Sequence, residues 1–213
     1  MHVKKHLKNQ RILITAGPTW VSIDPVRVIS NTASGETGRL LAKSLAARGA
    51  RVTLLLGPGV DIAADKKINV IRFSFFDDLK KILKDQLLQQ YDSIIHSAAV
   101  SDYRPAQMTH SKIKSCKKAW TMKLIRTPKL IERIKKVAPN SFAIGFKFDP
   151  RTTKNTLLKS AEELMLSSQL DAVVANTVIN GRYHAFIVTP DSVSGSIDSK
   201  SMLVKKITKL LSL

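Results

Sequence analysis

Short apolar runs rich in β-branched residues alternate with helix-like patterns through the first half of this chain. Residues 11–16 have the composition of a buried strand, and residues 36–48 carry apolar side chains at helical spacing up to Gly49. Strands that alternate with helices form a parallel sheet covered on both faces. We therefore predict an α/β protein with a doubly wound, Rossmann-like, mostly parallel sheet. Further strands are predicted at residues 51–56, 68–73 and 91–98, and a second helix at residues 76–90.

The second half of the chain keeps this pattern and then departs from it. Residues 100–120 contain Pro105 and four lysines without sustained periodicity, which is typical of a long functional loop. No internal repeat divides the 213 residues, so we predict a single domain over residues 1–213, with residues 1–10 flexible. The other predicted elements are helices at residues 128–137, 153–167 and 201–213, strands at 142–148 and 171–175, and a hairpin at 184–197.

The composition predicts a cytoplasmic protein without a membrane partner. No segment approaches the roughly 18 consecutive apolar residues that a membrane span requires. The basic start of the chain lacks the apolar region of an export signal. The single cysteine, Cys116, can form no intrachain disulfide, as expected in a reducing compartment.

The net charge of +19, from 35 Lys and Arg against 16 Asp and Glu, is the strongest anomaly of the composition. Such a charge suits a nucleic-acid partner, and it equally suits an enzyme that attracts phosphate-bearing substrates. The basic residues are spread along the whole chain with few aromatic residues among them, unlike a surface that stacks single-stranded bases. Nucleic-acid binding is therefore kept only as an alternative.

Two turns rich in small residues lie between the first predicted strand and the first predicted helix. Residues 15–19 include Gly17, and residues 31–38 include Ser34 and Gly35. Backbone amides at a helix N-terminus can approach a phosphate, which the helix dipole also favours. Capping of the helix by Ser34 explains the second turn equally well, so the spacing leaves its role open.

Several common catalytic patterns are missing from the sequence. It contains no G-x-x-x-x-G-K-[ST] phosphate loop and no G-x-S-x-G nucleophile elbow. A nicotinamide-dependent reductase of Rossmann type remains the main rival enzyme. The Tyr-x-x-x-Lys pair of short-chain reductases is absent, because no lysine stands four places after Tyr91, Tyr103 or Tyr183.

A series of short motifs occurs in order along residues 11–187. They are ITAGPT at 14–19, IDPVR at 23–27 followed by Asn31, Ser34, Gly35 and Gly38, AAVSDYR at 98–104, KIK at 112–114, TPKLI at 127–131, GFK at 145–147 and DAVVAN at 171–176. Together they resemble the phosphopantothenate-cysteine ligases, or phosphopantothenoylcysteine synthetases, of coenzyme A synthesis. Many bacterial members carry a flavin-dependent decarboxylase domain in front. Because that domain is missing here, the resemblance is to a stand-alone ligase.

The resemblance implies a two-step reaction. The carboxylate of 4'-phosphopantothenate attacks the α-phosphate of a nucleoside triphosphate and releases pyrophosphate, and the amine of L-cysteine then displaces the nucleotide. The family uses Mg²⁺ with CTP or ATP, and we favour CTP. Members are typically homodimers that pair through a small β subregion, to which we assign the hairpin at residues 184–197.

The resemblance also implies roles for individual residues. Asn31 would hold the acyl carbonyl and Lys112 the triphosphate, which makes them the catalytic candidates. An Asn cap and a solvated lysine are the alternatives for these two positions. Arg27, with Ser34 and Gly35, would bind the substrate. The nucleotide candidates are Gly17, Asp102, Lys112, Pro128, Lys129, Leu130, Ile131, Phe146 and Lys147.

For some of these nucleotide candidates the resemblance also implies which group they contact. Asp102 is the one candidate for contact with the metal. The segment from Pro128 to Ile131 would begin a helix whose amides face the nucleotide, and Phe146 would pack either on the base or in the core. Bacterial bifunctional members carry two lysines where this chain has Leu164 and Ser168, so we predict that Lys147 compensates for the missing charge.

Overall fold

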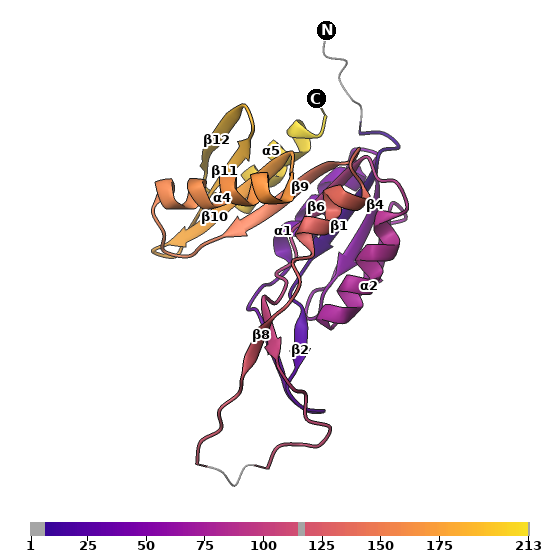
Figure 1. Cartoon of the computed structure of the whole chain (residues 1–213). Helices are drawn as coiled ribbons and strands as arrows, with labels where there is room; N and C mark the ends of the chain where they lie inside the picture. Colours follow the sequence, from indigo (N-terminus) through magenta and orange to yellow (C-terminus); the bar gives the residue numbers. More distant parts are fainter. Residues whose placement is uncertain (1–6, 115–117, 213) are drawn as a thin grey trace.

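A central sheet of eight strands confirms the predicted mostly parallel architecture (Figure 1). The computed structural model describes residues 7–114 and 118–212. The strands are β1 (Arg11–Ala16), β4 (Arg51–Leu56), β5 (Ile68–Arg72), β6 (Ser93–His96), β9 (Phe142–Phe148), β10 (Ala172–Ile179), β11 (Arg182–Thr189) and β12 (Ser192–Ile197). Their order is β12-β11-β10-β9-β6-β1-β4-β5. The strands from β10 to β5 are parallel, whereas β11 and β12 extend one edge in antiparallel fashion.

Helices cover both faces of this sheet, as the doubly wound prediction requires. One face carries α1 (Glu36–Ala47) and α5 (Lys200–Leu210), and the other carries α2 (Phe76–Leu87), the 3₁₀ helix η1 (Ile131–Arg133), α3 (Ile134–Val137) and α4 (Lys154–Ser168). Successive residues of β1 divide between the two cores, since Ile14 packs with α1 and Leu13 with α2. Burial on both faces explains why residues 12–14 of β1 form an uninterrupted apolar run.

Two small antiparallel sheets extend from one end of the body as an arm (Figure 1). One consists of β2 (Trp20–Ser22) and β3 (Val28–Ser30), and the other of β7 (Tyr103–Pro105) and β8 (Leu124–Arg126). We call residues 20–30, 103–114 and 118–126 the arm. The predicted long loop at residues 100–120 therefore contains a strand, β7, which is too short to produce a recognisable alternation.

The structure corrects the place of the predicted tail hairpin. A hairpin forms from β11 and β12, but it continues the central sheet through the pairing of β10 with β11. Backbone partners such as Val173 and Val188 account for this continuity. The separate small β region lies in the arm instead.

The start of the predicted helix at residues 128–137 is also corrected. Residues 128–130 are not helical, and η1 begins only at Ile131. The reason is tertiary, because Thr127 is tied to the loop after β6 by two hydrogen bonds. Its N–H donates to the carbonyl of Asp102 at 2.9 Å, and its hydroxyl to the carbonyl of Ser101 at 2.6 Å.

The beginning of the described chain is packed against the body. Leu7 is only 4% exposed and belongs to the core, and the N–H of Asn9 donates to the carbonyl of Gly49 at 2.9 Å. These contacts anchor part of the segment that we predicted to be flexible. Cys116 lies outside the described residues. Within residues 7–114 and 118–212, no helix is long and apolar enough to cross a membrane.

Candidate active site

The strand order of the sheet reverses next to β1. The chain goes from β1 to β4 and β5 on one side and then returns to β6 on the other side of β1. The loops that follow β1 and β6 therefore emerge side by side. They are joined by hydrogen bonds from the N–H of Ala99 to the carbonyl of Gly17 at 3.0 Å and from the N–H of Thr19 to the carbonyl of Ala99 at 3.3 Å. Ligands of doubly wound proteins bind at this switch point.

The N-terminus of α1 lies against the loop after β1. Its first residue follows Gly35, which has a φ of 64° and no side-chain capping hydrogen bond. A Cβ atom at Gly35 would lie 2.8 Å from Val60 Cγ2 and 3.0 Å from the nitrogen of Gly17, so glycine is required for this close approach. The Ser34 hydroxyl accepts only a long 3.4 Å hydrogen bond from the N–H of Glu36. Apart from this long bond, the backbone amides at the start of α1 have no side-chain cap, which suits the binding of an anion.

Asn31 reaches the same place from the end of β3. Its Nδ2 donates to the carbonyl oxygen of Ala99 at 3.0 Å and to that of Val100 at 3.4 Å. Gly35, not Asn31, occupies the N-cap position of α1, so Asn31 does not cap this helix. The amide instead connects the arm to the loop after β6. We call Gly17, Asn31, Ser34, Gly35 and residues 97–102 the switch-point site.

Buried hydroxyl groups hold the loop after β6 in position. The N–H of Ser101 donates to Thr19 Oγ1 at 2.9 Å, and the Ser101 carbonyl accepts the Thr127 hydroxyl. Thr19, Ser101 and Thr127 are all buried. Our sequence reasoning did not select Ser101 or Thr127. The available signal was their location directly after strands, next to the small residues of the loop.

A buried histidine supports the floor of the switch-point site. His96 Nδ1 lies 2.9 Å from the hydroxyl of Thr15, which accepts a 3.2 Å hydrogen bond from the N–H of Ala98. The hydrogen of that hydroxyl is therefore free to point toward Nδ1. Burial lowers the pKa of His96 to about 4, so its ring is neutral at physiological pH.

Asp102 and Lys129 form an ion pair beside this site. Lys129 Nζ lies 2.6 Å from Asp102 Oδ1, and more than half of each side chain is exposed. Two nucleotide candidates that are 27 residues apart in the sequence are thus brought together. Lys129 makes this contact from a segment that precedes η1 and is not helical.

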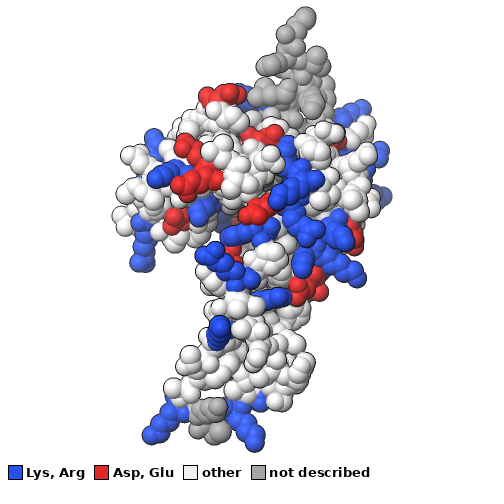
Figure 2. Space-filling view, viewed as in Figure 1, with Lys and Arg blue, Asp and Glu red and all other residues white. Residues whose placement is uncertain are grey.

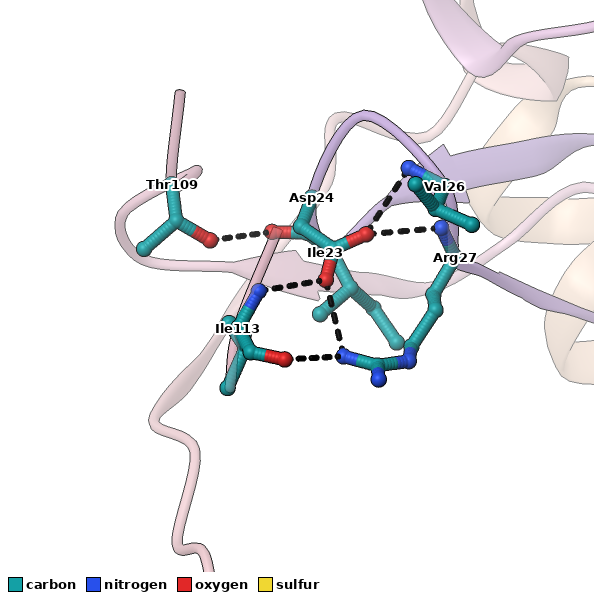
Figure 3. Close-up of polar contacts among 6 residues, drawn as sticks. All are labelled: Ile23, Asp24, Val26, Arg27, Thr109 and Ile113. Carbon is teal, nitrogen blue, oxygen red and sulfur yellow. Dashed lines mark hydrogen bonds and ion pairs between the residues drawn. The ribbon is translucent and has the colours of Figure 1, made fainter. Parts of the chain in front are cut away.

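Arg27 is engaged within the arm through one nitrogen of its guanidinium (Figure 3). Its Nη1 lies 2.9 Å from Asp24 Oδ2 and donates to the carbonyl of Ile113 at 3.3 Å. The Asp24 side chain is 0% exposed and also accepts the backbone N–H groups of Val26 and Arg27 at 2.8 Å and of Ile113 at 3.2 Å. Burial alone would raise the pKa of Asp24, but these hydrogen bonds and the Arg27 charge lower it below its ordinary value.

This network also fixes the place of Lys112. The residue is exposed and precedes Ile113, which is tied to the turn at the far end of β3. Asn31 lies four residues beyond Arg27, a separation of roughly 13 Å in an extended strand. By this estimate the backbone of Lys112 lies near the far end of β3, away from Asn31 of the same chain.

Phe146 and Lys147 lie where β9 extends past the end of β6. The last register pair of these strands is His96 with Gly145. Phe146 is half-buried and packs on the core that contains α1. Lys147, the next residue of the strand, points to the opposite face, which carries α4. A Cβ atom at Gly145 would lie 2.6 Å from Leu170 Cδ1 and 2.9 Å from Ile131 Cδ1, so a larger residue there would require these side chains to shift.

Leu164 and Ser168, where the resemblance expects lysines, are far from the carboxyl-terminal edge of the sheet, at which the switch-point site lies. Helix α4 returns from the carboxyl end of β9 to the amino end of β10, so its last turn lies at the amino-terminal edge of the sheet. Ser168 is only 3% exposed there, and Leu164 packs on the core. Lysines at these positions would not reach the switch-point site of the same chain. The prediction that Lys147 compensates for the two missing lysines assumed that they would contact the nucleotide. The position of α4 does not support that assumption within one chain.

The family model for the C-terminal domain of the DNA/pantothenate metabolism flavoproteins matches residues 7–207. The chain belongs to this family. Two relatives are the bifunctional coenzyme A biosynthesis proteins CoaBC of Thermococcus kodakarensis and Borreliella burgdorferi. They are 34% identical over 82% of this chain and 33% identical over 98% of it. The chain spans about half the length of these relatives, 43% and 54%.

Several solved structures share the fold of this chain. The flavoprotein of Streptococcus pneumoniae has a TM-score of 0.87 at 24% identity, and covers 95% of this chain and 98% of its own. The C-terminal domain of a CoaBC protein gives 0.78 at 25% identity over 98% and 97% of the two chains. A Cab2 variant in complex with phosphopantothenate-cysteine gives 0.76 at 18% identity over 96% and 88%.

Proposed function

We propose that this chain joins 4'-phosphopantothenate to L-cysteine through an acyl-nucleotidylate, with Mg²⁺ and with CTP favoured over ATP. The observation that carries the proposal is that Asn31, an amide donor, and the uncapped start of α1 both lie at the switch point. Membership of a family whose relatives are coenzyme A biosynthesis proteins supports the substrate class.

The first step needs charge neutralisation more than proton transfer. A carboxylate oxygen of 4'-phosphopantothenate attacks the α-phosphorus, the bond to the bridging oxygen breaks, and pyrophosphate leaves with both bonding electrons. The amides at the start of α1, together with Gly17, offer fixed donors to the phosphate groups. Lys129 and Lys112 supply positive charge for the departing pyrophosphate.

Asn31 acts in the second step. The cysteine amine attacks the acyl carbon, the nucleoside monophosphate leaves, and the amine proton is lost as the amide forms. An amide donor aimed at the acyl oxygen stabilises the negative charge that develops there. The 3.4 Å contact of Asn31 with Val100 is the weaker of its two hydrogen bonds, so its hydrogen is the one available to the acyl oxygen.

The residues present suit Mg²⁺ that is held mainly by the nucleotide. Among the residues that the structure describes, no group of three or more His, Cys, Asp or Glu side chains gathers to hold a metal. Mg²⁺ in nucleotide sites commonly uses one or two carboxylates together with substrate phosphates. Asp102 can supply one carboxylate, which releases Lys129 for a phosphate. The metal would neutralise charge on the triphosphate.

We further propose that two copies of the chain pair through their arms rather than through the tail hairpin. Large apolar side chains are exposed along the arm, including Val26 at 66% and Trp120 at 46%. Figure 2 shows few charged side chains along the arm, except toward its end. Burial of this surface against a second copy would remove the apolar area from water. Because the attachment of Ile113 places the backbone of Lys112 toward the far end of β3 from Asn31 of its own chain, we propose that it serves the site of the second copy.

Product formation tests the function. The purified chain is incubated with 4'-phosphopantothenate, L-cysteine, Mg²⁺ and either CTP or ATP, and pyrophosphate and the ligated product are measured together. The proposal expects both products in equal amounts, with CTP the better substrate. Nicotinamide oxidation without pyrophosphate would support the reductase instead. Oligonucleotide binding with a steep salt dependence and no turnover would support the nucleic-acid binder.

A further inference from the structure

A second hollow lies at the amino-terminal edge of the sheet, opposite the switch-point site. Its volume is about 290 Å³. Arg11 and Arg51 are the first residues of β1 and β4, and Lys66 and Lys67 come just before β5. Tyr91 and Asn69 also line the hollow. None of these residues belongs to the proposed ligase site.

The register of the strands brings two of these cations, Arg11 and Arg51, to one face of the sheet. Arg11 is the direct backbone partner of Arg51, and Thr53 is the partner of Asn69. Side chains alternate along each strand, so Arg11 and Arg51 lie on the face that carries Leu13, Leu55 and α2. The hollow is thus lined by cations from three neighbouring strands or their ends.

Their positive charge has no partner within the described part of the chain. None of the four cations takes part in the ion pairs found among residues 7–114 and 118–212. The two nearest carboxylates accept backbone N–H groups instead: Asp92 that of Arg11 and Asp65 that of Lys67, both at 2.8 Å. Like charges opposite each other on adjacent strands are destabilising, and a bound anion would offset this cost.

One of the cations is already held in place. The guanidinium of Arg11 lies 5.2 Å from the centre of the Tyr91 ring, and Tyr91 is buried in the core below α2. Such a contact orients the guanidinium and reduces the entropy that it would lose when it binds an anion. The hollow therefore has a pre-ordered donor on one wall.

We propose that this hollow binds a compact polyphosphate anion with two or three linked phosphate groups. The row from β1 to β5 covers two strand spacings, roughly 10 Å, which a single phosphate group cannot bridge. Arginine and lysine are the side chains suited to phosphate oxygens. The hollow is separate from the proposed ligase site, so this proposal does not depend on the proposed ligase function.

A backbone amide titration by ¹H–¹⁵N NMR tests the proposal with site resolution. The full chain is titrated with pyrophosphate and, separately, with orthophosphate at constant ionic strength. We expect saturable shifts of the amides of Val52, Thr53 and Asn69 with pyrophosphate, and at least about tenfold weaker binding of orthophosphate. Shifts confined to the amides around Gly17 and residues 97–102 would overturn the proposal.

A matched pair of variants separates this hollow from the general basic charge. Figure 2 shows Lys and Arg side chains over much of the visible body. Removing any two positive charges could therefore weaken anion binding, so a control variant must lose the same charge elsewhere. Lys66→Gln with Lys67→Gln alters residues outside the strands and should weaken pyrophosphate binding at these amides by about tenfold or more. Lys205→Gln with Lys209→Gln on the exposed side of α5 removes the same charge and should change it less than about twofold. Equal effects of the two pairs would contradict a defined site.

Nucleic acid is the remaining source of linked phosphates. A single-stranded oligonucleotide is titrated at the same total phosphate concentration as pyrophosphate. If it perturbs the amides of Val52, Thr53 and Asn69 more strongly than pyrophosphate does, the hollow belongs to a nucleic-acid surface and the proposal is wrong. A weaker response supports the compact anion.

Discussion

The side-chain nitrogen of Asn31 lies 3.0 Å from the carbonyl oxygen of Ala99, to which it donates a hydrogen bond. The two residues are 68 positions apart in the sequence, and their contact joins the base of the arm to the loop after β6. It places an amide donor at the switch point, beside the start of α1. The proposed chemistry depends on this placement.

The first prediction concerns the donor itself. Asn31→Ala should lower ligated product by roughly 10²- to 10³-fold, because one oxyanion donor is worth about that factor. Triphosphate binding and folding should be retained, since the amide acts on the acyl group and is exposed. Product is measured by mass spectrometry and nucleotide affinity by calorimetry. Ser30→Ala, at the preceding residue, is the control and should stay near wild type, because the Ser30 hydroxyl donates only to backbone carbonyls, those of Thr19 at 3.4 Å and Asn31 at 3.2 Å. Normal turnover by Asn31→Ala would remove Asn31 from the mechanism.

The second prediction separates Lys112 from its neighbour. Lys112→Ala should slow carboxylate-dependent pyrophosphate release before cysteine is added, by about 10²-fold, because the leaving group loses a compensating charge. Lys114→Ala removes an equally exposed lysine two residues later and should have little effect. The rate is followed with a coupled pyrophosphate assay. Equal rates for the two variants would mean that Lys112 is an ordinary solvated lysine.

The third prediction tests whether Lys112 acts across a pair of chains. Asn31→Ala and Lys112→Ala proteins, each inactive, are unfolded together and refolded as a mixture. If Lys112 serves the second copy, mixed pairs contain one intact site, and about a quarter of wild-type activity should return through random assortment. If Lys112 serves its own chain, every site in the mixture lacks one residue and no activity returns. The refolded wild type is the control for recovery.

The fourth prediction follows from the buried His96. Its pKa is lowered to about 4, so the unfolded chain binds more protons than the folded chain between that pH and the ordinary value of 6.5. The stabilisation is therefore complete above pH 6.5 and is lost as the pH falls toward 4, by about 3 kcal/mol in the free energy of unfolding. Urea unfolding at pH 7 and pH 4.5 measures it. His96→Asn should lose less stability over this range, and an equal loss in both proteins would assign the effect to other groups.

Sequence patterns predict the helices and strands in which many successive turns or residues contribute to one buried face. The apolar stretch of β1 and the helical spacing of α1 indicate their structure because each buries a continuous face. Strand β7 has only three residues, too few for a periodic signal. The place of β11 depends on its pairing with β10, and a local pattern reveals a hairpin without revealing its other neighbour.

In the candidate site, too, some features have a local signal in the sequence and others depend on contacts between distant segments. The turns around Gly17 and Gly35 carry a local signal, because a left-handed backbone and close contact restrict the residue type. The start of η1 was missed because the hydrogen bonds of Thr127 to the loop after β6 override the helical pattern of the residues that follow. The Asp102–Lys129 ion pair is a contact between distant segments, which no spacing within the sequence expresses.

The most direct test of the account uses 4'-phosphopantothenate with ¹⁸O in its carboxylate. The wild-type chain converts it with L-cysteine, Mg²⁺ and CTP, and the phosphorus products are separated and analysed by mass spectrometry. An acyl-nucleotidylate predicts one ¹⁸O in the phosphate of CMP and none in the pyrophosphate, because the carboxylate oxygen that attacks the α-phosphorus leaves with the nucleotide. Formation of CDP with ¹⁸O in orthophosphate would contradict the account, since it would mean that the carboxylate attacks the terminal phosphate.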